Sequence, residues 1–195
     1  MAISVGLTVP ATLITSKKEH LLKFQKKYEN KKIVNKCASN TEFLMINGKR
    51  LAAFTYRLST EDVDQLPEEF GSSLFQIAVE KDFDIKTFYL NGVFYTQATF
   101  SSNSEYIDVR ISTKKKRNRV TNFKLPEGLE FKLDALMKKL SLNIGTIDLI
   151  KDIDGTFYFL EINPSGQFDY ISLLGNFHLD KLIAEHIISK TNEKN

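Results

Sequence analysis

The chain has 195 residues, of which 42% are hydrophobic and 26% charged, an ordinary composition for a globular protein that can bury a substantial core. The net charge of +3 is too small to indicate nucleic-acid binding, and no apolar run approaches the roughly 20 residues of a membrane span. Cys37 is the single cysteine, which excludes an internal disulfide and favours a reducing, cytoplasmic location; the first residues also lack the layout of a signal peptide.

The first half of the chain predicts a helix, a strand that ends in lysine, and two hairpins. Ser16 and Glu19 have the spacing of a capping box, which predicts a helix opening there. Residues 32–36 are typical of a strand that ends at Lys36. Asn47-Gly48 and Asn91-Gly92 each separate two strand-like runs. Such dipeptides favour type I′ turns, because both positions require a positive φ.

The second half predicts a third hairpin and two more helices. Asp154-Gly155 is again a two-residue turn signal. Leucine and isoleucine recur with helical spacing over residues 129–140 and 179–187, which predicts two amphipathic helices. Hairpins interspersed with helices indicate an α+β fold with mostly antiparallel sheets.

The third hairpin brings two carboxylates together. With a two-residue turn at Asp154-Gly155, Asp148 lies directly opposite Glu161, and Asn163 lies on the same face one step further along its strand. Opposed carboxylates repel each other unless a cation lies between them. Two carboxylates and an amide oxygen suit a hard cation such as Mg²⁺, so this face is a candidate metal site.

The alternative is a surface hairpin whose acidic pair is relieved by a nearby lysine. Lys151 is a candidate for that lysine, but its position predicts that it points to the other face. The same alternation places Ile150, Phe157 and Phe159 on the face of the acidic pair. A carboxylate pair beside apolar side chains favours a binding site over a solvated surface.

The remaining charged features are less specific. The basic run Lys114–Arg119 is compatible with a solvated loop, a nucleic-acid contact, or a clamp for phosphates or an acidic peptide. His20, His178 and His186 have no spacing typical of a catalytic triad or a zinc site.

Several segments resemble the ATP-grasp ligases, and more narrowly the branch that modifies ribosomally made peptides, the microviridin-type and grasp-with-spasm maturases. The segments are Gly145–Leu149, Phe159–Phe168 with its Asn-Pro-Ser-Gly-Gln-Phe stretch, Ser73–Lys81, residues 84–101, and Asn118–Pro126. The resemblance implies two α+β subdomains that grip a nucleotide between them. The small subdomain would comprise residues 1–74 and the large one residues 75–195.

The resemblance also implies roles for individual residues. Asp148, Glu161 and Asn163 would hold the Mg²⁺ ions that bridge the phosphates of ATP. Lys36 would reach the α- and β-phosphates, and Lys86 and Arg119 would offset charge at the transferred phosphate. The residues of the adenine and ribose site would be Gln76, Ile77, Val79 and Glu80.

This chain departs from the family pattern at three positions. Lys86 stands where arginine is usual and so lacks a planar, bidentate fork. Val120 replaces an asparagine, and Cys37 replaces a proline that often follows the phosphate-binding lysine. The segment that matches the start of the resemblance follows Met1 directly, which leads us to expect that the N-terminal domain usual in the family is missing.

The function implied by the resemblance is an ATP-dependent ligase that forms ester or amide crosslinks in a ribosomal precursor peptide through an acyl phosphate. Two alternatives stay open at this point: an ATP-grasp ligase for a small carboxylate or amino acid, and a non-catalytic nucleotide- or peptide-binding remnant. The expected partner is the peptide, with neither nucleic acid nor membrane, and a homodimer is left open.

Overall fold

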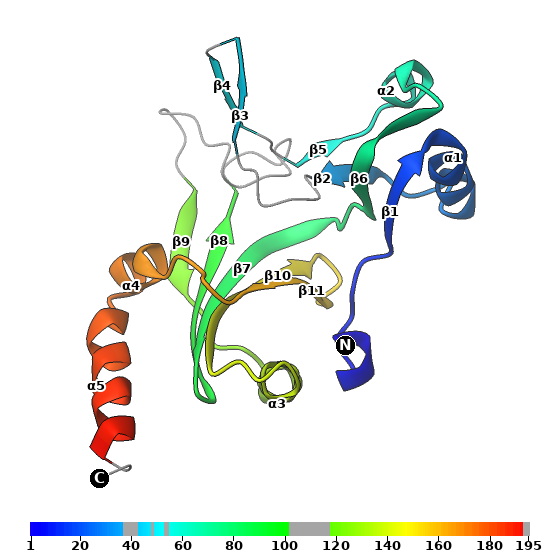
Figure 1. The fold of residues 1–195 in the computed structure, drawn as a ribbon. Coiled ribbons are helices and arrows are strands. Elements are labelled where there is room, and N and C mark those ends of the chain that lie inside the picture. Colours follow the sequence, from blue (N-terminus) through cyan, green and yellow to red (C-terminus); the bar gives the residue numbers. More distant parts are fainter. Residues whose placement is uncertain (37–42, 48, 53–54, 102–117, 193–195) are drawn as a thin grey trace. The chain divides into compact units, whose positions relative to one another are not determined.

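The computed structural model describes residues 1–36, 43–47, 49–52, 55–101 and 118–192. Cys37 and residues 114–117 of the basic run lie outside the described residues. The described residues form two compact units (Figure 1). Unit 1 comprises residues 1–9, 81–101 and 118–192, and unit 2 comprises the described residues between 10 and 80. The chain crosses between the units after Val9 and after Glu80; the subdomain boundary predicted at residue 74 stays a prediction.

Unit 2 contains a four-stranded sheet in the order β1-β6-β2-β5, and each of its pairings is antiparallel. The strands are β1 (Thr12–Lys17), β6 (Glu69–Ile77), β2 (Ile33–Lys36) and β5 (Tyr56–Arg57). Helices α1 (Lys18–Lys27) and α2 (Thr60–Gln65) complete the unit, together with the hairpin of β3 (Phe43–Ile46) and β4 (Lys49–Ala52). Its core is built around Leu21, Ile33, Val63 and Phe75.

Unit 1 contains a five-stranded antiparallel sheet in the order β11-β10-β7-β8-β9. The strands are β7 (Lys81–Leu90), β8 (Val93–Phe100), β9 (Arg119–Asn122), β10 (Ile144–Asp152) and β11 (Phe157–Asn163). The helical elements are η1 (Ile3–Val5), α3 (Glu127–Lys139), α4 (Asp169–Gly175) and α5 (Leu179–Asn192).

Alternation along the strands gives the sheet of unit 1 two covered faces. Ile85, Ile147 and Leu149 point to one face, where they pack with Leu133 and Met137 of α3. Phe88 and Leu90 point to the other face and pack with Ile171 of α4 and Leu179 of α5. The predicted α+β fold with mostly antiparallel sheets is confirmed.

The Asn91-Gly92 turn forms as predicted, and the predicted capping box does not form. Asn47 has the positive φ expected of the first turn, and Gly48 lies outside the described residues. Asn47 and Asn91 both have a positive φ, and they join β3 to β4 and β7 to β8. Ser16 still belongs to β1, and α1 opens at Lys18 after Lys17, which provides no side-chain cap. The capping box prediction there is wrong because pairing of β1 with β6 extends past Ser16. A capping box forms instead at Ser59 and Asp62, where α2 begins.

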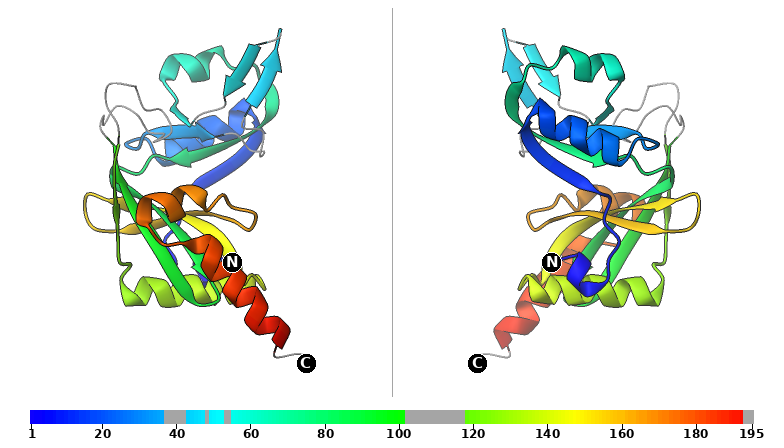
Figure 2. Two further views of the ribbon diagram at one scale, coloured as in Figure 1. Left: turned by 90° about the vertical axis from the view of Figure 1, so that its left-hand side faces the viewer. Right: turned by 90° about the vertical axis from the view of Figure 1, so that its right-hand side faces the viewer.

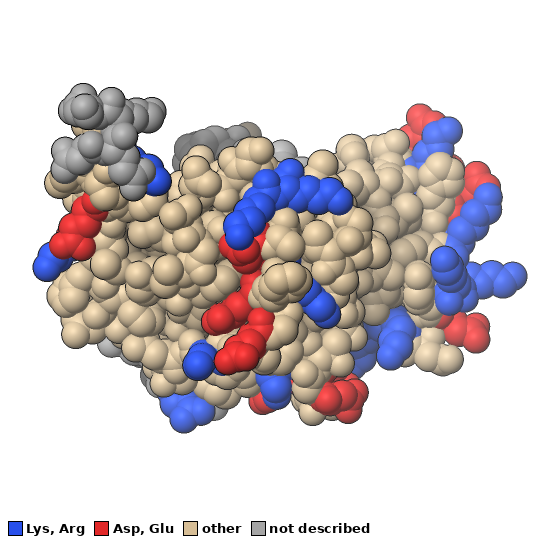
Figure 3. Space-filling view, turned by 90° about the horizontal axis from the view of Figure 1, so that it is seen from below, with Lys and Arg blue, Asp and Glu red and all other residues tan. Residues whose placement is uncertain are grey.

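Within the described residues, none of the helices is both long enough and apolar enough to cross a membrane. On the face seen in Figure 3, the lysine and arginine side chains of the described residues are interspersed with acidic ones.

Candidate functional site

The β10–β11 hairpin has the predicted pairing of Asp148 with Glu161 but a different turn. Gly155 has a φ of 90°, whereas Asp154 is not among the described residues with a positive φ. The Gly155 N–H donates to the Asp152 carbonyl, and the Asp152 N–H donates to the Thr156 carbonyl. This pattern is a three-residue loop whose last residue is left-handed, not the two-residue type I′ turn that the sequence predicted.

A β-bulge restores the predicted register. Next to the turn, Lys151 pairs with Phe157 and Leu149 with Phe159, one residue out of the predicted alignment. The register then shifts between Leu149 and Asp148, where β11 contributes one extra residue, so that Asp148 pairs with Glu161. The three-residue loop shifts the register by one residue and the bulge shifts it back, so the two carboxylates face each other.

The bulge also changes which side chains share a face. Phe157 and Phe159 pack into the core under α3, on the face opposite to Asp148. The prediction that they share the face of the acidic pair is therefore wrong, because the extra residue reverses the alternation between Phe159 and Glu161. Lys151 points to the face opposite to the acidic pair, as predicted; its ammonium bonds Asp82 at 2.8 Å and lies over the Phe83 ring.

Five polar side chains form a row straight across the sheet. Each pairs directly with the next, from β11 through β10, β7 and β8 to β9. We call this set the polar row; its members are Glu161, Asp148, Lys86, Gln97 and Asn122.

Lys86 is the cation that relieves the acidic pair. Its Nζ lies 2.9 Å from Asp148 Oδ1 and 3.1 Å from Oδ2, so the ammonium donates to both oxygens. The Lys86 side chain is 39% exposed and that of Asp148 26%, which leaves the pair open to solvent on one side. Sequence reasoning considered Lys151 for this part and missed Lys86, because the neighbour of β10 on its other side is β7, a pairing that the hairpin signal does not reveal.

Asn163 lies one step beyond Glu161, where the chain makes a tight turn. Its Oδ1 accepts a hydrogen bond from the Ser165 N–H at 3.1 Å, and its backbone carbonyl accepts from the Gly166 N–H. Gly166 passes very close to Thr146, the cross-strand partner of Asn163: a Cβ at Gly166 would lie 2.0 Å from Thr146 Oγ1. Only glycine fits this approach, so the Asn-Pro-Ser-Gly sequence fixes the turn that carries Asn163.

The other end of the polar row holds α4. Gln97 donates from Nε2 to the Ile171 carbonyl at 3.2 Å, and Asn122 donates from Nδ2 to the Gly175 carbonyl at 3.0 Å. Gln97 is only 1% exposed, and its Oε1 has no hydrogen-bond partner among the described residues; the same holds for Thr146 Oγ1. Sequence reasoning assigned no role to Gln97, Asn122 or Thr146.

Arg119 lies away from the row. It opens β9 opposite Phe100, and its guanidinium carbon is 4.2 Å from the centre of that ring, which packs against the core on the α3 face. The structure therefore brings Lys86, Asp148, Glu161 and Asn163 to one face of the sheet and Arg119 to the other. The catalytic role of Arg119 stays a prediction.

The predicted nucleotide-binding residues belong to unit 2. Lys36 is half-buried and ends β2 as expected, opposite Leu74. Gln76 is buried and donates from Nε2 to the Thr12 hydroxyl at 2.9 Å. Ile77 ends β6, and its N–H donates to the Ala11 carbonyl. Val79 and Glu80 follow β6, the first half-buried and the second exposed. Their nucleotide contacts stay predictions.

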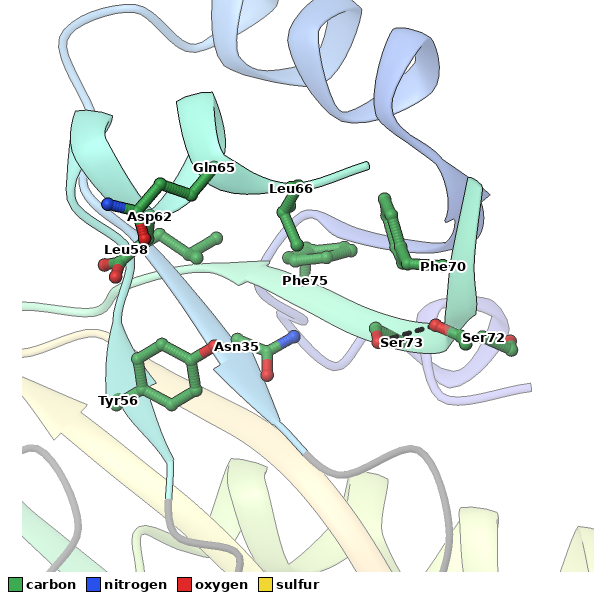
Figure 4. A pocket seen from close by; sticks show the side chains of 11 residues that line it. Asn35, Tyr56, Leu58, Asp62, Gln65, Leu66, Phe70, Ser72, Ser73 and Phe75 are labelled. Carbon is green, nitrogen blue, oxygen red and sulfur yellow. Dashed lines mark hydrogen bonds between the residues drawn. The ribbon is translucent and has the colours of Figure 1, made fainter. Parts of the chain in front are cut away.

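Unit 2 also has a hollow of about 430 Å³, shown in Figure 4. Asn35, Tyr56 and Asp62 supply polar groups to its wall, and Phe75 lies among its apolar side chains. Burial, followed by the nearby Asp62 carboxylate, raises the pKa of Tyr56 above its usual range. None of the predicted site residues lines this hollow.

The oxygen donors at the row suit a hard cation. Asp148, Glu161 and Asn163 present carboxylate and amide oxygens on successive same-face pairs of β10 and β11, the chemistry that Mg²⁺ prefers. Within the described residues, three or more His, Cys, Asp or Glu side chains nowhere gather closely enough to hold a metal by themselves. The site thus has two carboxylates, with Lys86 already bonded to one of them, and would leave further coordination positions to ligand oxygens.

Solved structures of peptide-modifying ligases resemble this chain. The macrocyclase MdnC of Microcystis aeruginosa, solved with its precursor peptide MdnA, is 28% identical with a TM-score of 0.75; the match covers 88% of this chain and 51% of MdnC. An ATP-grasp ligase of Chryseobacterium gregarium, solved with ADP and a leader and core peptide, is 23% identical with a TM-score of 0.77, covering 89% and 52%.

The ligase PsnB, solved with a precursor variant, Mg and ADP, is 16% identical with a TM-score of 0.77, covering 97% of this chain and 56% of PsnB. The chain thus spans about half the length of the ligases that it matches. No protein-family profile and no curated protein matches the sequence.

Proposed function

We propose that this chain, which has the ATP-grasp fold and resembles the ligases that modify ribosomally made peptides, binds ATP with Mg²⁺ and uses it to crosslink a precursor peptide. The observation that carries the proposal is the polar row: Asp148 and Glu161 lie directly opposite each other, Asn163 is held beside them, and Lys86 lies next to Asp148. Support also comes from MdnC, the relative at 28% identity, which was solved with its precursor peptide.

In this proposal the metal ligands are Asp148, Glu161 and Asn163. A bound Mg²⁺ would neutralise phosphate charge and leave the γ-phosphorus open to attack. Lys86 supplies a positive charge on the same face, where a phosphate oxygen could replace its contact with Asp148. Lys36, Gln76, Ile77, Val79 and Glu80 are proposed as nucleotide contacts in unit 2, and Arg119 is proposed as a further cation for the phosphate or the peptide, although in this structure its side chain lies on the face opposite to the row.

The reaction needs no nucleophile from the protein. A side-chain carboxylate oxygen of the peptide attacks the γ-phosphorus of ATP, the bond to the β–γ bridging oxygen breaks, and ADP leaves with that electron pair. A hydroxyl or amine of the peptide then attacks the acyl carbon and loses its proton, while phosphate departs. The result is an ester or amide crosslink, one ADP and one phosphate.

Mass spectrometry of candidate peptides tests this function. We expect the chain, with ATP and Mg²⁺, to remove one water per crosslink from a peptide rich in Thr, Ser, Asp and Glu, and to release ADP in the same amount. Glu161→Gln should abolish both products. ADP release that is independent of peptide, with a small amino acid acting as acceptor instead, would contradict the peptide proposal and favour a ligase for small carboxylates.

Two finer proposals concern assembly and location. We propose that two copies associate through apolar side chains on α4 and on the far half of α5, the helix that leads away from the sheet in Figure 2. Leu173, Ile187 and Ile188 are 80%, 60% and 59% exposed there. Light scattering should report a dimer that Ile187→Glu dissociates; a monomeric parent would contradict it.

A cytoplasmic location is proposed because a ribosomally made peptide and ATP meet there.

A further inference from the structure

Lys86 lies between two possible acceptors in the polar row. Asp148 is its direct partner on β10, and Gln97 is its direct partner on β8. The ammonium has three N–H donors, of which two reach the oxygens of Asp148. The side chain is 39% exposed, so packing does not enclose it completely.

The side-chain oxygen of Gln97, Oε1, is a hydrogen-bond acceptor to which no group among the described residues donates. Its Nε2 must point to the Ile171 carbonyl, because a carbonyl oxygen can pair only with a donor. The other end of the amide, Oε1, is consequently left without a partner, although Gln97 is only 1% exposed. A buried carbonyl without a donor is costly, so a cation that arrived there would be stabilised.

A metal ion and Lys86 compete for the same oxygens. Lys86 donates to both oxygens of Asp148, so a Mg²⁺ held by that carboxylate would take at least one of them and would be repelled by the ammonium charge. We propose that Lys86 is a placeholder cation: it neutralises Asp148 while metal is absent, and it leaves for the Gln97 Oε1 and a phosphate oxygen when metal binds. This inference rests on the proposed function of the row as a metal and nucleotide site.

The exchange couples the binding of metal to that of nucleotide. Metal alone must displace Lys86 without compensation from a phosphate, so it binds weakly. When ATP is present, the displaced Lys86 gains an anionic partner, and each ligand raises the affinity for the other by the same factor. The row therefore favours the complex of metal with ATP over either ligand alone.

Lys86→Met tests the competition, with Lys151→Met as the matched control. Each removes a lysine from a cross-strand ion pair of the same sheet, but Lys151 bonds Asp82 on the opposite face. We expect Lys86→Met to bind Mn²⁺ alone about fivefold more tightly, as read from the EPR signal of the free ion. The expected gain is no larger because a partly exposed ion pair contributes little to stability. Lys151→Met should leave that affinity unchanged.

Gln97→Ala tests where Lys86 goes, with Asn122→Ala as its control. Both variants lose one hydrogen bond to a carbonyl of α4, but only Gln97 neighbours Lys86 in the row. We expect Gln97→Ala to weaken the binding of Mn²⁺ about threefold, because the displaced ammonium loses a hydrogen bond. Asn122→Ala should bind Mn²⁺ like the parent.

The same titrations with ATP present complete the test. ATP should raise the Mn²⁺ affinity of the parent by a larger factor than that of Lys86→Met. Equal Mn²⁺ affinities of the parent and Lys86→Met would overturn the placeholder, even if Asp148→Asn showed that the row binds metal. Equal effects of Gln97→Ala and Asn122→Ala would overturn the part assigned to Gln97. A parent that binds no Mn²⁺ with or without ATP would overturn the proposed function as well.

Discussion

At the scale of single residues, the central feature is Asp148, which has a carboxylate on one side and an ammonium on the other. Glu161 and Lys86 are its direct neighbours across β11 and β7. Repulsion from Glu161 and attraction to Lys86 therefore act on the same group, and the metal-free protein tolerates the acidic pair. The opposition of Asp148 and Glu161 could be predicted from the hairpin alone. The contact with Lys86 could not, because it depends on β10 pairing with a strand 62 residues away.

Two charge-removing variants should differ in stability without metal. Glu161→Gln removes only repulsion, so its free energy of unfolding should stay level or rise. Asp148→Asn breaks the ion pair with Lys86 and should cost up to about 1 kcal/mol, since the pair is partly exposed. Urea denaturation in EDTA measures both. A marked loss of stability in Glu161→Gln would show that its carboxylate is structural.

The residue at position 86 should also determine the rate of ADP release. Lys86→Arg restores the planar fork that matches a phosphate and should raise the rate of ADP release severalfold. Lys86→Ala should lower it by about tenfold to a hundredfold, the range for removing one preorganised donor at a developing charge. Steady-state ADP release with peptide measures both, and unchanged rates in the two variants would remove Lys86 from the phosphate site.

At the scale of elements, the β10–β11 hairpin shows how the pairing of two residues can be predicted correctly although the turn between their strands is predicted wrongly. Asp154-Gly155 predicted a two-residue turn, and the chain instead forms a three-residue loop with a bulge further along β11. The strand alternation did not reveal the bulge, because Phe157, Phe159 and Ile162 fit either face until the core under α3 selects one. The β7–β8 hairpin follows its Asn-Gly signal, because Leu90 pairs with Val93 and leaves only those two residues in the loop.

Gly166 should be the most sensitive glycine of this region. In Gly166→Ala the new Cβ would meet Thr146 Oγ1 and lie 2.9 Å from the Asn163 carbonyl oxygen, so the turn that carries Asn163 must shift. We expect a loss of about 1–3 kcal/mol, typical of overpacking, together with weaker metal binding. Gly128→Ala is the control: it meets nothing within 4 Å, lies in α3, and should be neutral or stabilising. Thermal unfolding of both variants measures this difference, and equal midpoints would contradict the close approach of Gly166 to Thr146.

The capping box of α2 should give unit 2 an acid-dependent element. The hydrogen bond from the backbone N–H of Ser59, followed by that from its hydroxyl, holds the pKa of Asp62 below its usual range. A carboxyl whose pKa is lowered on folding stabilises the protein above its unfolded pKa, and this stabilisation is lost as the pH falls through the folded pKa. Asp62→Asn should therefore reduce stability at neutral pH and converge with the parent as the pH falls through the folded-state pKa of Asp62. Parallel pH dependences would show that the carboxylate does not cap the helix.

At the scale of the whole molecule, the sequence was sufficient for the fold class and for the pairing of Asp148 with Glu161. Turn dipeptides and helical stripes are local signals, and they predicted most elements correctly. The order of strands in each sheet is non-local, so the polar row, the contact of Gln97 with α4 and the position of Arg119 on the opposite face required the structure. The match to known ligases covers about half of their length, and the reaction of the whole enzyme is accordingly a proposal.

Calorimetric titration of the chain with Mg²⁺ and ATP tests the central claim most directly, namely that Asp148 and Glu161 form a metal and nucleotide site. We predict saturable binding by the parent, loss of that binding in Asp148→Asn and Glu161→Gln, and retained binding in Asp82→Asn, which removes a carboxylate of the same sheet that is paired with Lys151. Nucleotide affinity that is the same in all four proteins, or absent from the parent, would contradict the account.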